Sequence, residues 1–168
     1  ACVVLAINLY SGRNAGQLAG VVPTPSPVSD VKPDPAEQRK KMMEGSAPMM
    51  MAQIGKGNVK EIADVSGDVV WSDERQAGYL RVKGLPKNDT SKQTYQLWIF
   101  DGTQDPRTPI DGGTFDINSD GEVVIPIDPM VKARNPKMFA VTIEKAGGVV
   151  VSGREKIAAL AKVETPAA

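Results

Sequence analysis

The sequence predicts an all-β fold: an antiparallel β-sandwich of about seven to eight strands or a small barrel, with a short helix and an extended linker at the N-terminus. From residue 57 onward, short runs alternate polar and apolar residues with a period of two, and turns rich in Gly, Asn and Asp separate these runs. Seven of the eight aromatic residues fall between Trp71 and Phe139, which places the core in this region.

The composition excludes several classes of function. The chain has 168 residues, 20 Lys and Arg against 20 Asp and Glu, no His and one Cys. Zero net charge argues against a nucleic-acid partner, which requires a surplus of basic residues. The absence of His removes His-based catalysis and the commonest transition-metal ligand, and a single Cys forms neither an internal disulfide nor a metal-binding cluster. We therefore expect a binding, sensing or structural module with no enzymatic activity and no cofactor.

The first ten residues, ACVVLAINLY, are predicted to be the truncated end of a transmembrane helix, with Tyr10 at the membrane interface. A complete span needs about 20 apolar residues, and the run lacks the basic start of a signal peptide. Two alternatives remain open. One is a short buried element of the folded domain, and the other is a lipidated Cys2.

Residues 11–56 are predicted to be a linker that contains a short helix and a Met-rich segment. Five prolines between residues 21 and 36 favour an extended polyproline II spacer, because proline lacks the backbone donor that regular pairing needs. Asp34 and Pro35 predict a helix start, since Asp accepts from free N–H groups and Pro is tolerated at the first helical position. We expect this helix to run to Glu44 and to end at Gly45.

Five methionines fall within ten residues around the end of this helix. Thioethers favour Cu(I), but neither His nor Cys accompanies them, so apolar contact is the preferred interpretation and a copper site is the alternative. The five residues are Met42, Met43, Met49, Met50 and Met51.

The predicted strands lie in a domain that extends from residue 57 to residue 165. In the run 94–100, Tyr95, Leu97 and Ile99 share one face while Gln96, Trp98 and Phe100 share the other, so we expect a strand that is covered on both faces. The Ala-rich run 157–163 fits either a strand or a short helix. The other predicted strands are 58–65, 67–73, 77–85, 114–117, 122–127 and 137–145, with a turn at 111–113.

Three stretches resemble the C-terminal domain of the anti-sigma-K factor family. They are VKGLP at 82–86, YQLWI at 95–99 and AVTIEKAGG at 140–148, and the resemblance covers residues 59–163. The family pattern usually reads TIEPAGGS followed by Pro-Thr-Gly. This chain departs from that pattern at Lys145, at Val149 and at residues 152–154.

The resemblance implies a bacterial single-pass protein of the cytoplasmic membrane, with this domain on the extracytoplasmic side. It implies that a cytoplasmic segment, absent from this chain, binds an extracytoplasmic-function sigma factor and that a site protease releases the factor. The alternative is an exported β-sandwich for adhesion or carbohydrate binding. Sugar sites usually expose aromatic rings, so burial of both Trp71 and Trp98 would weaken that alternative.

The motif residues are expected to have structural roles first. Thr142 and Glu144 are predicted to share the solvent-facing side of their strand. The carboxylate of Glu144 is predicted to accept hydrogen bonds from the free N–H groups of Gly147 and Gly148, which would fix the loop that follows.

Residues 116–121, DINSDG, match the first half of a calcium-binding loop, with Asp116, Asn118 and Asp120 as candidate ligands. Ile127 stands where the bidentate acid is expected, so a hairpin turn is the preferred interpretation.

A second group of carboxylates, Asp101, Asp105 and Asp111, is crowded near Arg107. Paired carboxylates serve glycosidases, but a solvated loop rich in Gly and Pro is the preferred interpretation here.

Overall fold

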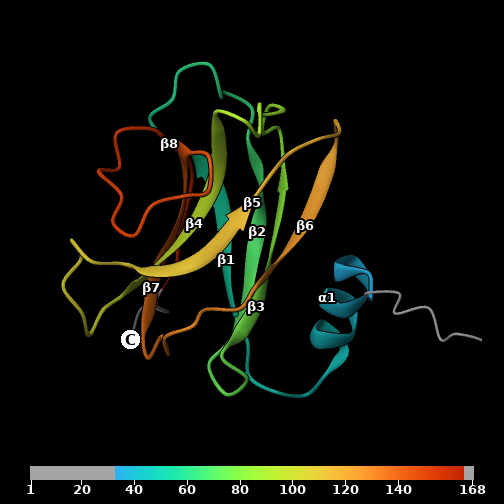
Figure 1. The fold of residues 1–168 in the computed structure, drawn as a ribbon. Helices are drawn as coiled ribbons and strands as arrows, with labels where there is room; N and C mark the ends of the chain where they lie inside the picture. The colour runs from blue at the N-terminus through green and yellow to red at the C-terminus, as the bar shows by residue number, and fades with distance from the viewer. Residues whose placement is uncertain (1–32, 165–168) are drawn as a thin grey trace, which may run out of the picture. The chain divides into compact units, whose positions relative to one another are not determined.

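The computed structural model describes residues 33–164, which form one helix and eight strands (Figure 1). The predicted transmembrane segment 1–10 and the first part of the predicted linker 11–56, up to residue 32, lie outside the described residues. The elements in chain order are α1 (Pro35–Glu44), β1 (Met50–Lys56), β2 (Ser66–Ser72), β3 (Ala77–Lys83), β4 (Gln93–Asp101), β5 (Ile110–Phe115), β6 (Glu122–Ile127), β7 (Pro136–Lys145) and β8 (Ile157–Lys162).

All eight strands belong to one sheet in the order β5-β4-β7-β8-β1-β2-β3-β6, and every neighbouring pair is antiparallel. The sheet curls until its two end strands, β5 and β6, approach each other without pairing, so it forms a nearly closed barrel. The predicted all-β antiparallel fold is therefore confirmed.

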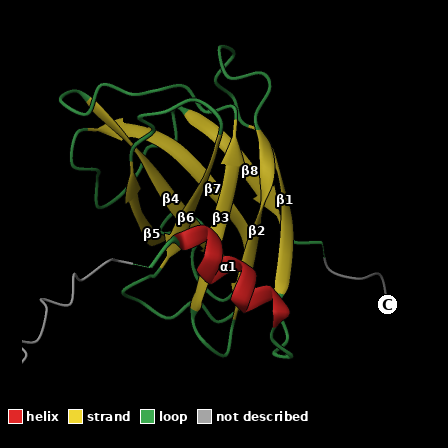
Figure 2. Ribbon diagram, turned by 90° about the vertical axis from the view of Figure 1, so that its right-hand side faces the viewer, coloured by secondary structure: helices red, strands yellow, loops and turns green. Residues whose placement is uncertain are grey.

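The N-terminal helix is confirmed at the predicted residues. The side chain of Asp34 accepts a hydrogen bond from the Ala36 N–H at 3.0 Å, Pro35 is the first helical residue and Gly45 is the C-cap. Only Met42 of this helix is buried, because the helix is charged around most of its circumference. Figure 2 shows α1 lying across the outer face of the sheet, where it contacts β3 and β6.

The sheet begins earlier than the sequence predicted. Residues 50–56, predicted to belong to the linker, form β1, which pairs with β2 on one side and β8 on the other. Ala52 and Ile54 are buried and Gln53 between them is exposed, so the period of two is present, but only Ile54 of this strand has a strong β propensity. Backbone hydrogen bonds to β2 and β8 stabilise β1 as a strand where its own sequence has weak β propensity.

Three other local predictions are corrected or decided. The strand predicted at 58–65 is wrong: the segment turns, and the Asn58 side chain accepts from the Ile157 N–H and donates to the Glu155 carbonyl. The turn predicted at 111–113 lies inside β5, where the register with β4 shifts. Residues 157–162 form a strand, since three small side chains, Ala158, Ala159 and Ala161, allow it to be buried between β7 and β1.

The core has two parts. The larger part fills the inside of the barrel and contains Trp71, Tyr95, Leu97 and Phe139, with the Trp71 and Phe139 rings 6.2 Å apart. The smaller part lies outside β4 and β7 and contains Trp98, Phe100 and Ala140. The prediction that the run 94–100 is covered on both faces is confirmed, since β4 is buried from Thr94 to Asp101.

The five methionines have different surroundings. Met42 of α1 is buried and Met50 packs against the main core, whereas Met43 and Met51 are exposed. Met49, Met50 and Met51 line one surface hollow. Apolar contact, the preferred interpretation, describes the two that face the sheet.

A pair of substitutions tests the position of β1. We expect Ala52→Asp to lower the free energy of unfolding by about 3 kcal/mol or more, because it places a carboxylate in the core. Met51→Asp, on the exposed side of the same strand, should cost about 1 kcal/mol or less. Urea denaturation of both variants measures the difference, and equal losses would contradict a central β1.

Candidate functional site

Four of the family-like motif residues lie on the outer face of β4 and β7: Gln96, Trp98, Thr142 and Glu144. Tyr95 and Leu97 instead belong to the main core. Residues 146–156, the connection between β7 and β8, fold over this face, and we name them the cover loop. Val149 of this loop packs against Trp98 and its neighbours. The site is therefore a loop held on a sheet, and its geometry is set by a few buried polar side chains.

Gln96 holds the middle of the cover loop. Its side-chain amide donates to the Val149 carbonyl at 2.9 Å and accepts from the Val149 N–H at 2.9 Å. Gln96 is only 1% exposed, so both hydrogen bonds are shielded from water. Gly148 has φ +77°, and a Cβ there would lie 2.8 Å from Thr114 Cγ2 and 3.0 Å from Gln96 Oε1. This close approach requires glycine.

Trp98 and Thr142 form a second buried pair across β4 and β7. The indole Nε1–H of Trp98 donates to Thr142 Oγ1 at 2.9 Å, and both residues are fully buried. The prediction that Thr142 faces solvent is wrong, because the cover loop and the second core part occupy that face. The alternation of polar and apolar residues along β7 did not indicate that Thr142 is buried. A polar side chain that forms a hydrogen bond to a neighbouring strand gives the same sequence pattern as a polar side chain in solvent.

Glu144 holds the far part of the cover loop, but through a different donor from the predicted one. The hydroxyl of Ser152 donates to the Glu144 carboxylate, and Ser152 Oγ in turn accepts from the Arg154 N–H at 2.9 Å. The Gly148 N–H donates to the Lys145 carbonyl at 2.9 Å. Gly147, with φ +83°, provides the left-handed turn at this point.

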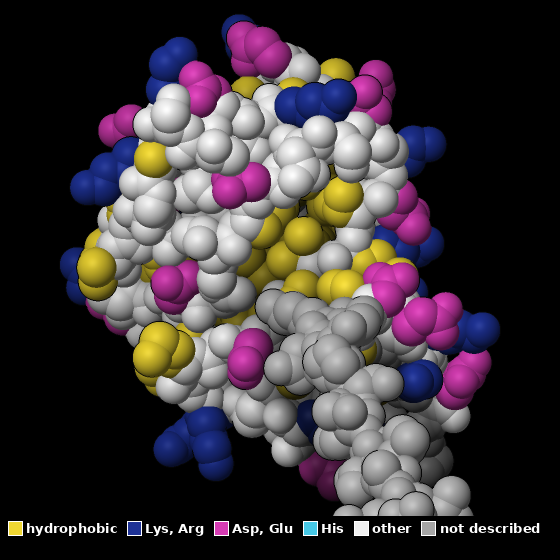
Figure 3. All heavy atoms as spheres, turned by 45° about the vertical axis from the view of Figure 1, so that its right-hand side comes forward, with side chains coloured by type: hydrophobic (Ala, Val, Ile, Leu, Met, Phe, Trp, Pro, Cys, Tyr) yellow, Lys and Arg dark blue, Asp and Glu magenta, His cyan; other side chains and the backbone are white. Residues whose placement is uncertain are grey.

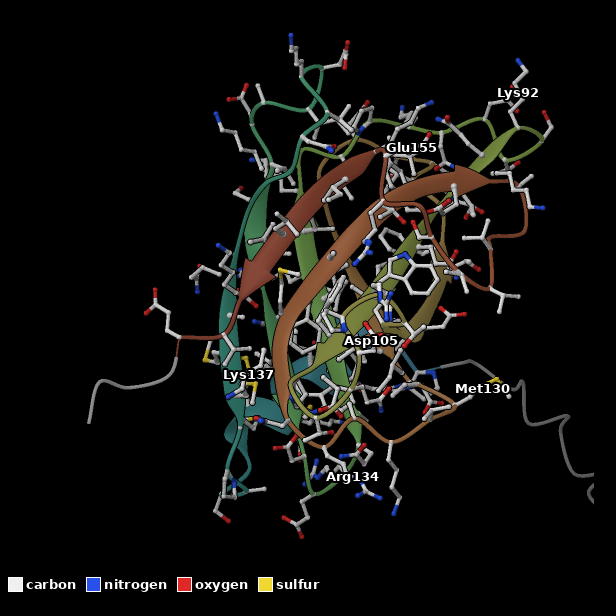
Figure 4. The ribbon with its side chains drawn as sticks, turned by 90° about the vertical axis from the view of Figure 1, so that its left-hand side faces the viewer. Lys92, Asp105, Met130, Arg134, Lys137 and Glu155 are labelled. Atoms are coloured by element: carbon white, nitrogen blue, oxygen red, sulfur yellow. The ribbon has the colours of Figure 1, made fainter. Side chains whose placement is uncertain are left out.

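Arg154 connects the cover loop to the connection between β4 and β5. Its Nη1 donates to the Pro106 carbonyl at 2.7 Å, and its guanidinium carbon lies 5.8 Å from the centre of the Phe100 ring. Asp105, which is labelled on this face in Figure 4, pairs with Arg107, and that hydrogen bond lowers the pKa of the Asp105 carboxyl. The sequence did not predict this contact of Arg154. Its one indication is an arginine within a loop that is rich in glycine.

The three carboxylates of the acidic group do not form a pair. Asp101 is buried and accepts from the Thr103 N–H, the Thr103 hydroxyl and the Arg134 N–H, the last at 2.6 Å. Burial alone would raise the pKa of Asp101, but these hydrogen bonds outweigh it and lower that pKa below its ordinary value. Asp111 accepts from the Gly113 N–H at 2.8 Å. Each carboxylate therefore stabilises its own loop.

The candidate calcium ligands have protein partners. Asp116 accepts from the Asn88 side chain at 2.7 Å and from the Thr94 hydroxyl at 2.9 Å, and Asp120 pairs with Lys87 at 3.0 Å. Asn118 is exposed between them. Within residues 33–164, no group of three or more His, Cys, Asp or Glu side chains is placed to hold a metal ion. The predicted hairpin turn is wrong, because residues 116–121 join β5 to β6, the two end strands of the sheet, which do not pair with each other.

Two surface hollows flank the cover loop. One is about 430 Å³ and is lined by Lys92, Glu144 and cover-loop residues; the other is about 570 Å³ and lies at the end of the barrel around Tyr95. Lys92 and Glu155 stand at this end of the molecule in Figure 4. The face in Figure 3 intersperses basic and acidic side chains and shows hydrophobic side chains in a hollow, with no large area of one charge.

The described residues form a nearly closed antiparallel barrel with a loop anchored on it by buried polar side chains, and such a fold does not by itself assign a function. The comparisons give the family: a family described as "Anti-sigma-K factor rskA, C-terminal" matches residues 1–153, and the chain belongs to it. The match ends before β8. No curated protein and no solved structure matches the chain.

Gln96→Ala tests the anchoring of the cover loop. Removing the amide leaves the Val149 N–H and carbonyl without their partners, so the free energy of unfolding should fall by about 1 to 3 kcal/mol. Hydrogen exchange at the Val149 amide should accelerate more than exchange in β1. Unchanged exchange at Val149 would contradict the anchoring role.

Asp101 should make stability depend on pH in the acid range. Because its pKa is lowered on folding, its contribution is fully present above the ordinary carboxyl pKa of 3.8 and is lost as the pH falls through the lower folded value. Asp101→Asn should therefore lose less stability than the unmodified chain between pH 5 and about pH 2. Urea unfolding at several pH values measures this, and parallel pH profiles would contradict it.

Proposed function

We propose that this chain is the extracytoplasmic regulatory part of a membrane-anchored anti-sigma factor that controls an extracytoplasmic-function sigma factor. The observation that carries the proposal is the family match over residues 1–153. In this scheme residues 1–10 belong to the membrane anchor, residues 11 to about 32 form the spacer, and the barrel is the exported domain. The sigma factor binds a cytoplasmic segment outside this chain, and a site protease acts between the two.

In this proposal the barrel within residues 33–164 is the regulatory domain. Its buried polar side chains, including Gln96, Thr142 and Asp101, serve loops and strands of the barrel itself. Within the described residues, no helix has the length and apolar character that a membrane span needs. The exported adhesion or sugar-binding alternative loses its main support, because Trp71 and Trp98 are both 0% exposed.

Two measurements on the full-length gene product test the proposal. A phosphatase that is active only after export, fused after residue 164, should be active, and the same enzyme fused at the N-terminus should not be. Affinity capture of the full-length protein should recover a sigma factor, and the control, residues 33–164 alone, should not. A cleavable signal directly before Ala1 together with no captured sigma factor would overturn the proposal.

A further inference from the structure

Two loops expose pairs of large hydrophobic residues to solvent. In the connection between β6 and β7, Met130 is 102% exposed and Val131 is 58% exposed, and in the cover loop the exposed fractions of Val150 and Val151 are 93% and 59%. These four are the most exposed large hydrophobic side chains among the described residues, and we name the two pairs the apolar tips. Single exposed hydrophobic side chains are ordinary, but adjacent pairs in neighbouring loops indicate contact with an apolar partner.

The two apolar tips lie on the same side of the barrel. Arg154 of the cover loop donates to the carbonyl of Pro106, which belongs to the connection between β4 and β5. Thr108 of that connection lines a surface hollow of about 320 Å³ together with Met130 and Val131. The connection between β4 and β5 therefore lies beside both loops that carry the tips. Figure 4 shows Met130 pointing away from the barrel.

The charges around the apolar tips are nearly balanced, with a small basic surplus. Three basic residues follow the tips in the sequence and form no ion pair within residues 33–164: Lys132, Arg134 and Arg154. Two acidic residues, Asp111 and Asp128, line the hollow beside Met130, and Asp105 pairs with Arg107. Burial of the tips is therefore the main source of affinity for a partner, and attraction to anionic groups is a smaller one.

This surface suits a lipid bilayer better than a folded protein partner. A specific protein interface has a continuous buried centre with aromatic or Arg anchors. Here the tips are separated by the polar connection GTQDPRTP at 102–109, and the ring of Phe100, which lies beneath Arg154, is buried. Lipid acyl chains are fluid and pack around each tip separately, while long basic side chains keep their charges among the headgroups.

We propose that the apolar tips insert into the surface of a lipid bilayer and hold the barrel against it, with the side that carries the cover loop facing the lipid. This rests on the proposed function, in which residues 1–10 anchor the chain and the spacer keeps the barrel within reach of the same bilayer. Two short apolar pairs bind weakly by themselves, and a tether raises their effective concentration at the membrane. Docking in this orientation hides the cover loop, and detachment exposes it.

The test uses the whole 168-residue chain with one fluorescent label at a time, in a Cys2→Ser background that leaves no other thiol. The label, nitrobenzoxadiazole, is attached to Met130→Cys, to Val150→Cys or, as a matched control, to Met51→Cys at an exposed position of β1. The chain is added to vesicles of phosphatidylethanolamine and phosphatidylglycerol that contain a lipid with a quencher in its acyl chain. We expect quenching at residues 130 and 150 to be about threefold or more stronger than at residue 51, because only the tips contact acyl chains.

A second set of variants tests whether the two tips dock together. Val150→Ser combined with Val151→Ser should lower the quenching at residue 130 about threefold or more, because both tips belong to one docked surface. The control Met43→Ser, at an exposed position of α1, should leave that quenching unchanged. Equal quenching at all three labelled positions, no quenching at either tip, or an unchanged signal at residue 130 in the serine variant would overturn the proposal. These readouts need neither export nor a sigma factor, so failure here is distinguishable from failure of the proposed function.

Discussion

The burial of β4 on both faces is the constraint on which the rest of the domain depends. Its inner residues, Tyr95 and Leu97, belong to the barrel core, and its outer residues, Gln96 and Trp98, lie under the cover loop. A strand covered twice cannot leave polar groups without partners, so the outer face needs Gln96 to bond the loop backbone and Thr142 to accept from the indole. The cover loop is therefore anchored to the sheet through Gln96 and Val149, although most of its residues are exposed.

Two segments pack on the outside of the barrel, the cover loop and α1, and they are held by different kinds of contact. The cover loop is joined by the two hydrogen bonds between Gln96 and Val149, by the hydrogen bond from Ser152 to Glu144, and by apolar packing around Trp98. The helix α1 is joined chiefly by one buried ion pair and one methionine, and it leaves a buried donor without a partner. Buried ion pairs contribute little net stability after desolvation, so α1 is expected to detach from the barrel more easily than the cover loop does.

Local sequence predicted what depends on local periodicity. The limits of α1 follow from Asp34 and Gly45, and the two faces of β4 follow from strict alternation of large residues. The prediction failed at residues 50–56 and 58–65, where the strand has weak propensity and the turn carries apolar residues. The prediction also placed Thr142 in solvent, because the local sequence of β7 does not show that the cover loop packs on this face of the strand.

The sequence by itself determined the all-β class, the single helix before the barrel, and the family, since these depend on periodicity, end signals and ordered motifs. Only the tertiary structure decided that one sheet curls into a nearly closed barrel with β1 in its middle, and that Glu144 bonds Ser152 instead of two glycines. It alone joined Arg39 to Asp68, which are 29 residues apart. The contact between Arg39 and Asp68 depends on how α1 packs across the sheet, and that packing follows from strand order, which is a property of the whole chain that no short stretch of sequence contains.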